Sequence, residues 1–277
     1  MRAYEVIERI DAFCDVVPRR RARADVFGPL VLFVPTGPGW PYYARPRRGP
    51  RPPVTAAGIR AVRARQRELL IPQSFEWIEQ VAPEMAAAAS EAGLDVQTHP
   101  LMVLSAPPPA GPPAGLPSLP PGVTVRVVTP EDAEIDRIWA VPAVAFGHPG
   151  TAAGEAGVPE RDKIAADYDG GSIEMLRERL RSGQSELVAA FGPDGPLAAG
   201  SCQAVDGVAE ITGVGVLPSC RRQGLGAAVT ALLARDALDH GVTTVFLSAS
   251  DAAVARIYAT IGFREIGVAM IAEPGDG

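Results

Sequence analysis

Hydrophobic and polar positions follow two periods along the C-terminal part of the chain, which predicts strands mixed with helices. Apolar or alternating runs bounded by turn residues predict strands at 124–129, 185–191, 196–205, 209–218, 243–250 and 264–272. Apolar stripes at helical spacing predict helices at 130–147, 172–183, 225–241 and 251–263. The resulting order, β-α-α-β-β-β-α-β-α-β, predicts an α/β fold with a mixed sheet and helices on both faces.

The N-terminal part repeats some of this order in a smaller α/β lobe. Strands are expected at 31–35, 74–80 and 96–104, with helices at 55–69 and 82–94. An alignment that pairs Gly93 with Gly262 and Leu94 with Phe263 places both pairs just past a helix end. This favours a degenerate internal duplication, although strand-helix alternation also arises by chance.

A proline-rich stretch separates the two parts. Residues 105–122 contain eight prolines and no charged residue, so they are expected to form an extended spacer rather than a helix or a central strand. The predicted organisation is an N-terminal lobe at 1–104, a linker at 105–121 and a C-terminal domain at 122–277.

Composition and charge narrow the classes of function. With 277 residues, 47% of them hydrophobic, the chain can bury one large core or two modest ones. Its net charge is -6, with 14 arginines against 11 acids up to residue 122 and 12 basic residues against 21 acids beyond it. The arginine clusters at 18–23 and 44–51 read as solvated loops rather than a nucleic-acid surface. The acidic second half mildly favours a cationic acceptor.

Location and metal chemistry are also constrained by the sequence. Apolar runs fall short of the ~18 residues of a membrane span, and acids occupy the N-terminus, so a cytoplasmic protein without a membrane partner is expected. Three cysteines, Cys14, Cys202 and Cys220, and three histidines are widely spaced without a CxxC pair. We therefore expect neither a disulfide framework nor a metal site.

A glycine loop is the strongest chemical signal in the chain. Residues 219–228 read SCRRQGLGAA, after the apolar run ITGVGVLP. A Walker loop would need a lysine, but the single lysine is Lys163, and a Rossmann loop would need a third glycine. Backbone N–H groups of residues 222–227 at a helix start are expected to bind an anion. The alternative is a tight strand-to-helix turn.

The loop resembles the signature of the GCN5-related N-acetyltransferase (GNAT) superfamily, [RQ]-x-x-G-x-[GA]. A second family signature, N-x-x-A-x-x-x-Y-x-x-x-G-F, is matched at Tyr258, Gly262 and Phe263, while Asp251 replaces the usual Asn and Val254 the usual Ala. The resemblance implies acetyl-CoA as cosubstrate. The cofactor-binding residues implied are Val214, Val216, Arg221, Arg222, Gln223, Gly224, Leu225, Gly226, Ala227 and Asp251.

Two glycines interrupt the strand before the loop. Gly213 and Gly215 lie inside the expected strand at 209–218, where glycine commonly marks a bulge or a close approach of another chain segment. In the GNAT family this strand diverges from the next one and the pantetheine arm of coenzyme A enters the gap. The resemblance implies that Val214 and Val216 bond to that arm.

Catalytic roles follow from the same resemblance. Tyr258 is expected to protonate the departing thiolate, the alternative being a core aromatic residue. Glu210, eleven residues before Arg221, is expected to be the general base, the alternative being a solvated carboxylate at a strand end. His148 lies in the stretch that lines the acceptor site in the family, although a loop histidine is often incidental. Cys220 is not favoured as an acyl carrier, because no histidine neighbours it in sequence.

These observations predict an N-acetyltransferase. It would move an acetyl group from acetyl-CoA to a primary amine of a small molecule or protein by direct transfer. The alternative is a non-catalytic acyl-CoA-binding regulatory module. The acceptor stays open, and so does a homodimer.

Overall fold

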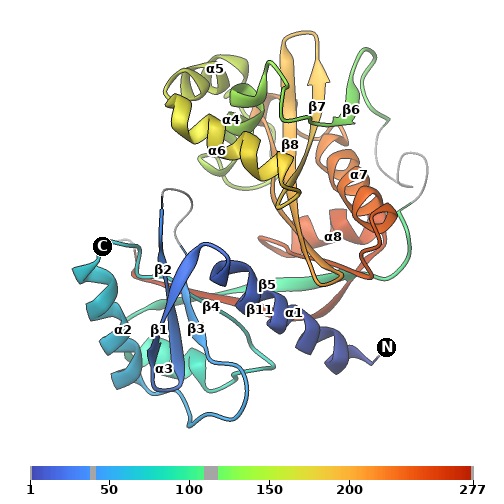
Figure 1. Cartoon of the computed structure of the whole chain (residues 1–277). Helices are drawn as coiled ribbons and strands as arrows, with labels where there is room; N and C mark the ends of the chain where they lie inside the picture. The colour runs from blue at the N-terminus through green and yellow to red at the C-terminus, as the bar shows by residue number, and fades with distance from the viewer. Residues whose placement is uncertain (1, 38–41, 109–117, 276–277) are drawn as a thin grey trace. The chain divides into compact units, whose positions relative to one another are not determined.

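The chain was analysed as a computed structural model, which describes residues 2–37, 42–108 and 118–275. It divides into two compact units (Figure 1). Unit 1 contains the described residues of 1–101, 248–250 and 265–277, and unit 2 contains those of 102–247 and 251–264. The last strand of the chain is therefore divided between the units.

Unit 1 is built on a mixed sheet with strand order β1-β2-β3-β4-β11-β5. Strand β11 runs antiparallel to β4, with Met270 opposite Trp77. Both residues lie in a buried apolar cluster with Leu32, Ile59 and Phe75. The elements are α1 (Ala3–Arg19), β1 (Ala22–Phe27), β2 (Leu30–Pro35), β3 (Ala44–Pro46), α2 (Ala56–Glu68), β4 (Phe75–Ile78), α3 (Met85–Glu91), β5 (Asp95–Leu104) and β11 (Phe263–Glu273).

Unit 2 contains an antiparallel run of strands, β6-β7-β8-β9, followed by β10, which is parallel to β9. Helices α4 and α7 pack on this sheet. The elements are β6 (Thr124–Val127), α4 (Ile135–Phe146), α5 (Val158–Ala166), α6 (Gly170–Arg181), β7 (Glu186–Gly192), β8 (Gly195–Val205), β9 (Val208–Val216), the 3-10 turn η1 (Pro218–Cys220), α7 (Leu225–Asp239), β10 (Thr244–Ser248) and α8 (Ala252–Ile261).

The mixed α/β fold predicted from the sequence is confirmed, but two helices and two strands were missed, namely α1, α5, β1 and β3. Every residue of β1 keeps some exposure to solvent, so its apolar alternation is weak. Helix α1 buries Val6, Ile7, Ile10 and Phe13 at helical spacing, so it was overlooked although the sequence carries its apolar stripe. Helix α5 has Arg161 on its buried face. The guanidinium of Arg161 donates hydrogen bonds to the carbonyl oxygens of Pro196 (2.7 Å) and Asp194 (2.9 Å), which replaces an apolar contact. Residues 109–117 of the expected spacer lie outside the described residues.

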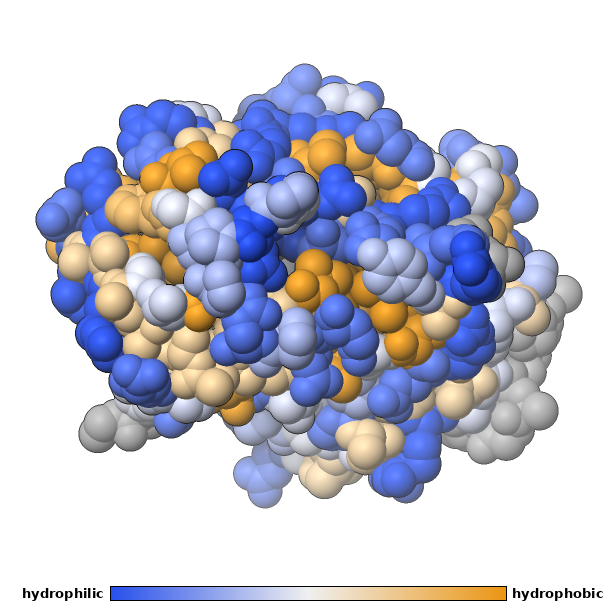
Figure 2. All heavy atoms as spheres, turned by 90° about the horizontal axis from the view of Figure 1, so that it is seen from below, coloured by the Kyte–Doolittle hydropathy of each residue, from blue (hydrophilic) through white to orange (hydrophobic). Residues whose placement is uncertain are grey.

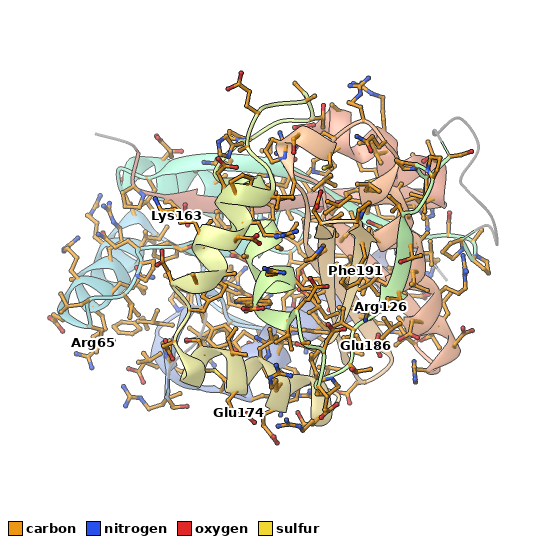
Figure 3. The ribbon with its side chains drawn as sticks, turned by 90° about the horizontal axis from the view of Figure 1, so that it is seen from above. Arg65, Arg126, Lys163, Glu174, Glu186 and Phe191 are labelled. Carbon is orange, nitrogen blue, oxygen red and sulfur yellow. The ribbon has the colours of Figure 1, made fainter. Side chains whose placement is uncertain are left out.

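A cation-π contact adds to the pairing of β6 with β7 at the edge of the sheet. The guanidinium carbon of Arg126 lies 4.0 Å from the ring centroid of Phe191, and Figure 3 shows the two side chains together, with Glu186 on the same strand as Phe191. Arg126 also forms an ion pair with Asp132 at 2.6 Å. The strand that opens unit 2 is thereby fixed to its neighbour.

Helix α4 crosses β9 at a glycine. A Cβ atom at Gly215 would lie 2.8 Å from the Cα of Pro142 and 2.9 Å from the Cβ of Ala145. Only a residue without a side chain allows this approach, which confirms the close contact expected at a strand-interior glycine. The C-terminal end of α4 is consequently held against the strand that precedes the glycine loop.

The surface mixes apolar and polar side chains. On the face drawn in Figure 2, hydrophobic residues are interspersed with hydrophilic ones. Among the described residues, helices long and apolar enough to cross a membrane are absent.

Replacing Gly215 by Ala is expected to destabilise the protein by about 1–3 kcal/mol, because the added methyl group would overlap the backbone of α4. Urea denaturation followed by circular dichroism measures this change. Gly170→Ala is the matched control, because a Cβ there has no neighbour within 4 Å. Equal midpoints for the two variants would contradict the tight crossing.

Candidate functional site

The glycine loop has an unusual backbone. Arg222 has φ +66° and Gly224, which is the N-cap of α7, has φ +76°. The left-handed region is costly for a residue with a side chain, so Arg222 is a point of local strain. These two residues turn the chain sharply from η1 into α7.

Backbone donors of the loop point at no acceptor. Within the described part of the chain, hydrogen bonds from the N–H groups of residues 222–227 are absent, and the N-cap glycine offers no side chain to bind them. Helix α7 is held by the buried side chains of Leu225, Val229 and Leu233. The row of N–H groups at its positive end is therefore fixed in place and suits an anion.

The two arginines of the loop differ in role. The guanidinium of Arg221 donates hydrogen bonds to the carbonyl oxygens of Ala145 (3.0 Å), His148 (2.6 Å) and Ala152 (3.2 Å). Its backbone N–H donates to the carbonyl of Pro218. Arg222 is exposed, so its guanidinium is accessible to a ligand. Both arginines are predicted to bind the cofactor; the guanidinium of Arg221 has three acceptors within the protein, whereas that of Arg222 is open to solvent.

Strand β9 is paired with β10 along only part of one edge. Its pairing with β10 covers Val208, Ala209 and Glu210, opposite Thr244, Val245 and Phe246. Beyond Glu210, β9 continues to Val216 without further pairing to β10 in the described residues. A free strand edge exposes backbone donors and acceptors to an added strand.

A bulge and the alternation of the strand decide which groups face this free edge. Between the pairs Ala199–Gly215 and Ser201–Thr212, β9 contains one extra residue, next to Gly213 with φ +63°. The N–H of Leu217 donates to the carbonyl of Leu197, on the side of β8. Because successive N–H groups point to opposite edges, those of Val216 and Val214 face the free edge.

The loop and the free edge lie next to each other. A Cβ atom at Gly226 would lie 3.3 Å from the Cγ2 of Val216 and 4.0 Å from the Cγ1 of Val214. Leu225 and Ala227, on either side of Gly226, are buried, and Gln223 is half-buried. Anion-binding amides and strand-edge amides therefore form one continuous surface.

Glu210 lies on β9 at the point where pairing with β10 stops. Burial raises the pKa of its carboxyl group to about 7. Hydrogen bonds and ion pairs to this carboxyl are absent within the described residues. A carboxyl group that titrates near neutral pH and has no partner is suited to exchange protons with a ligand.

Tyr258 lies on α8 and is half-buried. Its ring contacts Phe263, with the ring centroids 6.2 Å apart and an interplanar angle of 58°. Burial raises its pKa to about 12, so the hydroxyl stays protonated at neutral pH. This hydroxyl forms no hydrogen bond with the described residues, so it is available as a proton donor.

Other predicted residues have structural contacts of their own. The Asp251 carboxylate accepts hydrogen bonds from the N–H groups of Ala253 (2.7 Å) and Val254 (2.9 Å) and so caps α8. His148 is exposed, and its Nδ1 lies 3.0 Å from the carbonyl oxygen of Val144. Asp169 caps α6 through the N–H of Ser172, and this hydrogen bond lowers the pKa of its carboxyl group.

One trio of side chains could hold a cation. Ligand atoms of Glu186, Asp236 and His240 lie within 4.8 Å of one another, among the residues that the structure describes. Asp236 and His240 are at the C-terminal end of α7, whereas the glycine loop is at its N-terminal end. Sequence reasoning missed this trio because Glu186 is some fifty residues away from the other two in the chain.

The comparisons with known proteins agree with this site. The model of the Acetyltransferase (GNAT) family matches residues 159–263, which include Glu210, the glycine loop and Tyr258. No curated protein matches the sequence.

Solved structures extend the similarity over both units. A GCN5-related N-acetyltransferase from Kribbella flavida is 26% identical, with 98% of this chain and 96% of that one covered and a TM-score of 0.66. A tandem GNAT protein from the clavulanic acid biosynthesis pathway is 18% identical, with 91% and 80% covered and a TM-score of 0.52. A GCN5-related N-acetyltransferase-like protein from Streptococcus suis 89/1591 is 11% identical, with 98% and 99% covered and a TM-score of 0.54. At these lower identities the similarity concerns the fold.

Family match, fold and site geometry lead to one assignment. The chain carries a domain of the GCN5-related N-acetyltransferase superfamily at residues 159–263, together with a second α/β unit.

Proposed function

We propose that the part of the chain from residue 122 onward is an acetyl-CoA-dependent N-acetyltransferase that acetylates a primary amine by direct transfer. The observation that carries this proposal is the pair of neighbouring groups of free backbone donors, one at the edge of β9 and the other at the N-terminus of α7.

The pyrophosphate and the pantetheine arm of coenzyme A each suit one of the two groups of backbone donors. Its pyrophosphate is an anion that suits the N–H groups of residues 222–227, with Arg222 and Gln223 at the entrance. Its pantetheine arm is an extended chain with amide groups, which suits the free edge at Val214 and Val216. No side chain of the loop needs to move for either contact, because the donors belong to the backbone.

The catalytic roles follow from the protonation states. Bound acetyl-CoA supplies an acetyl group activated as a thioester. Glu210, directly or through water, takes a proton from the ammonium form of the acceptor, since its carboxyl group titrates near pH 7. The N–H of Val216 donates to the carbonyl oxygen on which charge develops. Tyr258 gives its proton to the departing sulfur, and the second proton that the nitrogen loses as the amide forms returns to the Tyr258 oxygen, directly or through water.

Direct transfer is favoured over a cysteine-bound intermediate. Burial and nearby carboxylates raise the pKa of the Cys202 thiol, which disfavours the thiolate. Cys220 contacts the hydroxyl of Ser219 at 3.7 Å, and histidines near it are absent among the described side-chain contacts. Cys202 is thus held as a thiol, and Cys220 lacks a histidine contact that would form the usual nucleophile–base pair.

For the N-terminal lobe, we propose a degenerate GNAT half that binds no cofactor. Gly93 after α3 and Gly262 after α8 both have positive φ, at +79° and +110°, and each is followed by a buried apolar residue. Ala89 stands where the repeat has Tyr258, so the lobe has no hydroxyl at this position. This agrees with a fold shared with a tandem GNAT protein.

The acceptor is proposed to be a primary amine of a small molecule or a protein, with His148 among the groups that meet it. The excess of acidic residues after residue 122 favours an acceptor that approaches as a cation. A cytoplasmic location would supply acetyl-CoA to the site.

Release of free thiol from acetyl-CoA in the presence of a panel of primary amines tests the function. Amine-dependent release is expected. Saturable binding of acetyl-CoA without turnover on any amine would instead favour a regulatory module that binds acyl-CoA.

Tyr258→Phe is expected to reduce turnover at least tenfold while the Kd for acetyl-CoA changes little, because the variant lacks the proton donor but keeps the ring contact with Phe263. Thiol release and calorimetric titration measure the two quantities. Unchanged turnover would rule out Tyr258 as the acid.

Gly224→Val is expected to abolish acetyl-CoA binding. A β-branched residue is strongly disfavoured at φ +76°, so the row of N–H groups would be displaced. Calorimetric titration with coenzyme A measures the effect, and Gly241→Ala, at a left-handed glycine after α7, controls for the backbone strain. Full affinity in Gly224→Val would contradict the loop assignment.

The rate of the wild-type enzyme is expected to rise with pH to a plateau, with a midpoint near pH 7. Glu210 acts as a base only when deprotonated, and its pKa is about 7, so activity is lost as the pH falls below this value. Glu210→Gln should lower kcat at least tenfold and remove this midpoint. An unchanged pH profile in the variant would assign the base to another group.

A further inference from the structure

Arg221 joins the glycine loop to the chain segment between α4 and α5. We call residues 147–157 the acceptor-side segment, because the proposed function places the acceptor there. The three carbonyl oxygens bound by the Arg221 guanidinium belong to the last turn of α4 (Ala145) and to this segment (His148 and Ala152). An irregular segment and a rigid helix end are thus tied to one side chain.

The chemistry of these contacts requires arginine. A guanidinium presents several donors in a rigid plane, so it bridges three carbonyls that a single ammonium would not reach together. Carbonyl groups in the last turn of a helix lack intrahelical partners and carry partial negative charge, so a cation there is stabilising. Burial lowers the pKa of Arg221, which shows that the group is partly removed from water.

Two backbone hydrogen bonds strengthen the same junction. The N–H of Gly154 donates to the carbonyl of Pro218 (3.1 Å), and the N–H of Ser219 donates to the carbonyl of Ala156 (2.9 Å). Leu217 and Ala156 are buried in the same apolar cluster. The acceptor-side segment is therefore bound to η1, from which the glycine loop begins.

Arg221 lies between η1, to which the acceptor-side segment is bound, and the N–H groups of residues 222–227, which are expected to bind an anion. The next residue, Arg222, has the strained left-handed backbone, and the free N–H groups begin there. An anion that binds these N–H groups stabilises the strained turn, and this turn sets the direction in which the Arg221 side chain leaves the backbone. Contacts on the two sides of residue 221 are thus mechanically linked.

We propose that Arg221 is a positioning residue that couples cofactor binding at the glycine loop to order in the acceptor-side segment. Its guanidinium acts on the carbonyls of residues 145–152, not on the phosphates. The inference rests on the proposed function, since it takes the loop as the coenzyme A site.

Hydrogen exchange with and without saturating coenzyme A tests the coupling. In the wild-type protein, coenzyme A should slow amide exchange in peptides that cover residues 147–157 at least threefold. Arg221→Ala should bind coenzyme A with a Kd within about fivefold of wild type but lose this slowing. Arg221→Lys should recover only part of it, because a single ammonium replaces the bridging guanidinium.

Two matched variants distinguish coupling from general damage. Arg222→Ala removes the neighbouring, exposed guanidinium, so it should weaken coenzyme A binding but keep the slowing once the site is saturated. Arg181→Ala removes exposed ion pairs on α6 and should behave as wild type. Thermal unfolding of all variants reports on their stability.

The acetylation assay adds an independent readout. With an amine that is turned over, Arg221→Ala should raise the KM for the amine at least tenfold and leave the KM for acetyl-CoA within about fivefold. Retained slowing in Arg221→Ala, or wild-type binding of coenzyme A without slowing, would overturn the coupling and leave the proposed function intact. Failure of the wild-type protein to bind coenzyme A would overturn both.

Discussion

The free edge of β9 is the constraint on which the rest of the site depends. A strand inside a sheet normally satisfies its backbone groups on both sides, and an unmet donor that is removed from water is costly. Strand β9 pairs with β8 along most of its length but with β10 only up to Glu210. After η1, whose N–H groups are hydrogen-bonded, the glycine loop and the start of α7 again present backbone donors without acceptors among the described residues. The protein thus offers an extended ligand a path of main-chain contacts, which depend little on the identity of side chains.

Burial raises the pKa values of both ionisable residues of the site, Glu210 and Tyr258, with different consequences. Burial disfavours the charged form of both Glu210 and Tyr258, but the consequence differs with their ordinary pKa. For the carboxyl group, burial moves the pKa into the neutral range, where the group can gain or lose a proton. For the phenol, burial moves the pKa further from neutrality, so the proton is present whenever a strong base forms beside it. The same physical effect therefore gives the two residues the protonation states that the proposed base and acid roles require.

How much of this could be predicted from the sequence varied with the kind of signal. Short-range patterns were sufficient for the mixed α/β fold and for the bulge and close approach at Gly213 and Gly215, because each depends on neighbours in the chain. Helix α5 was missed because a buried arginine replaces its apolar face. The three hydrogen bonds of the Arg221 side chain were not predicted, since their acceptors are more than sixty residues away and are backbone oxygens, which every residue type carries.

The division of β11 between the units has a consequence for how the chain comes to be folded. In unit 1, β11 lies between β4 and β5 in the sheet, yet it comes after the whole of unit 2 in the sequence. During synthesis on the ribosome, residues 1–101 of unit 1 are therefore made long before β11, the strand that lies between β4 and β5 in the same sheet. Pairing of β11 with β4 closes a loop that contains all of unit 2, and such distant contacts form slowly. Until then the edges of β4 and β5 are exposed. The nascent N-terminal part of unit 1 is therefore the part of this protein that most needs protection from aggregation.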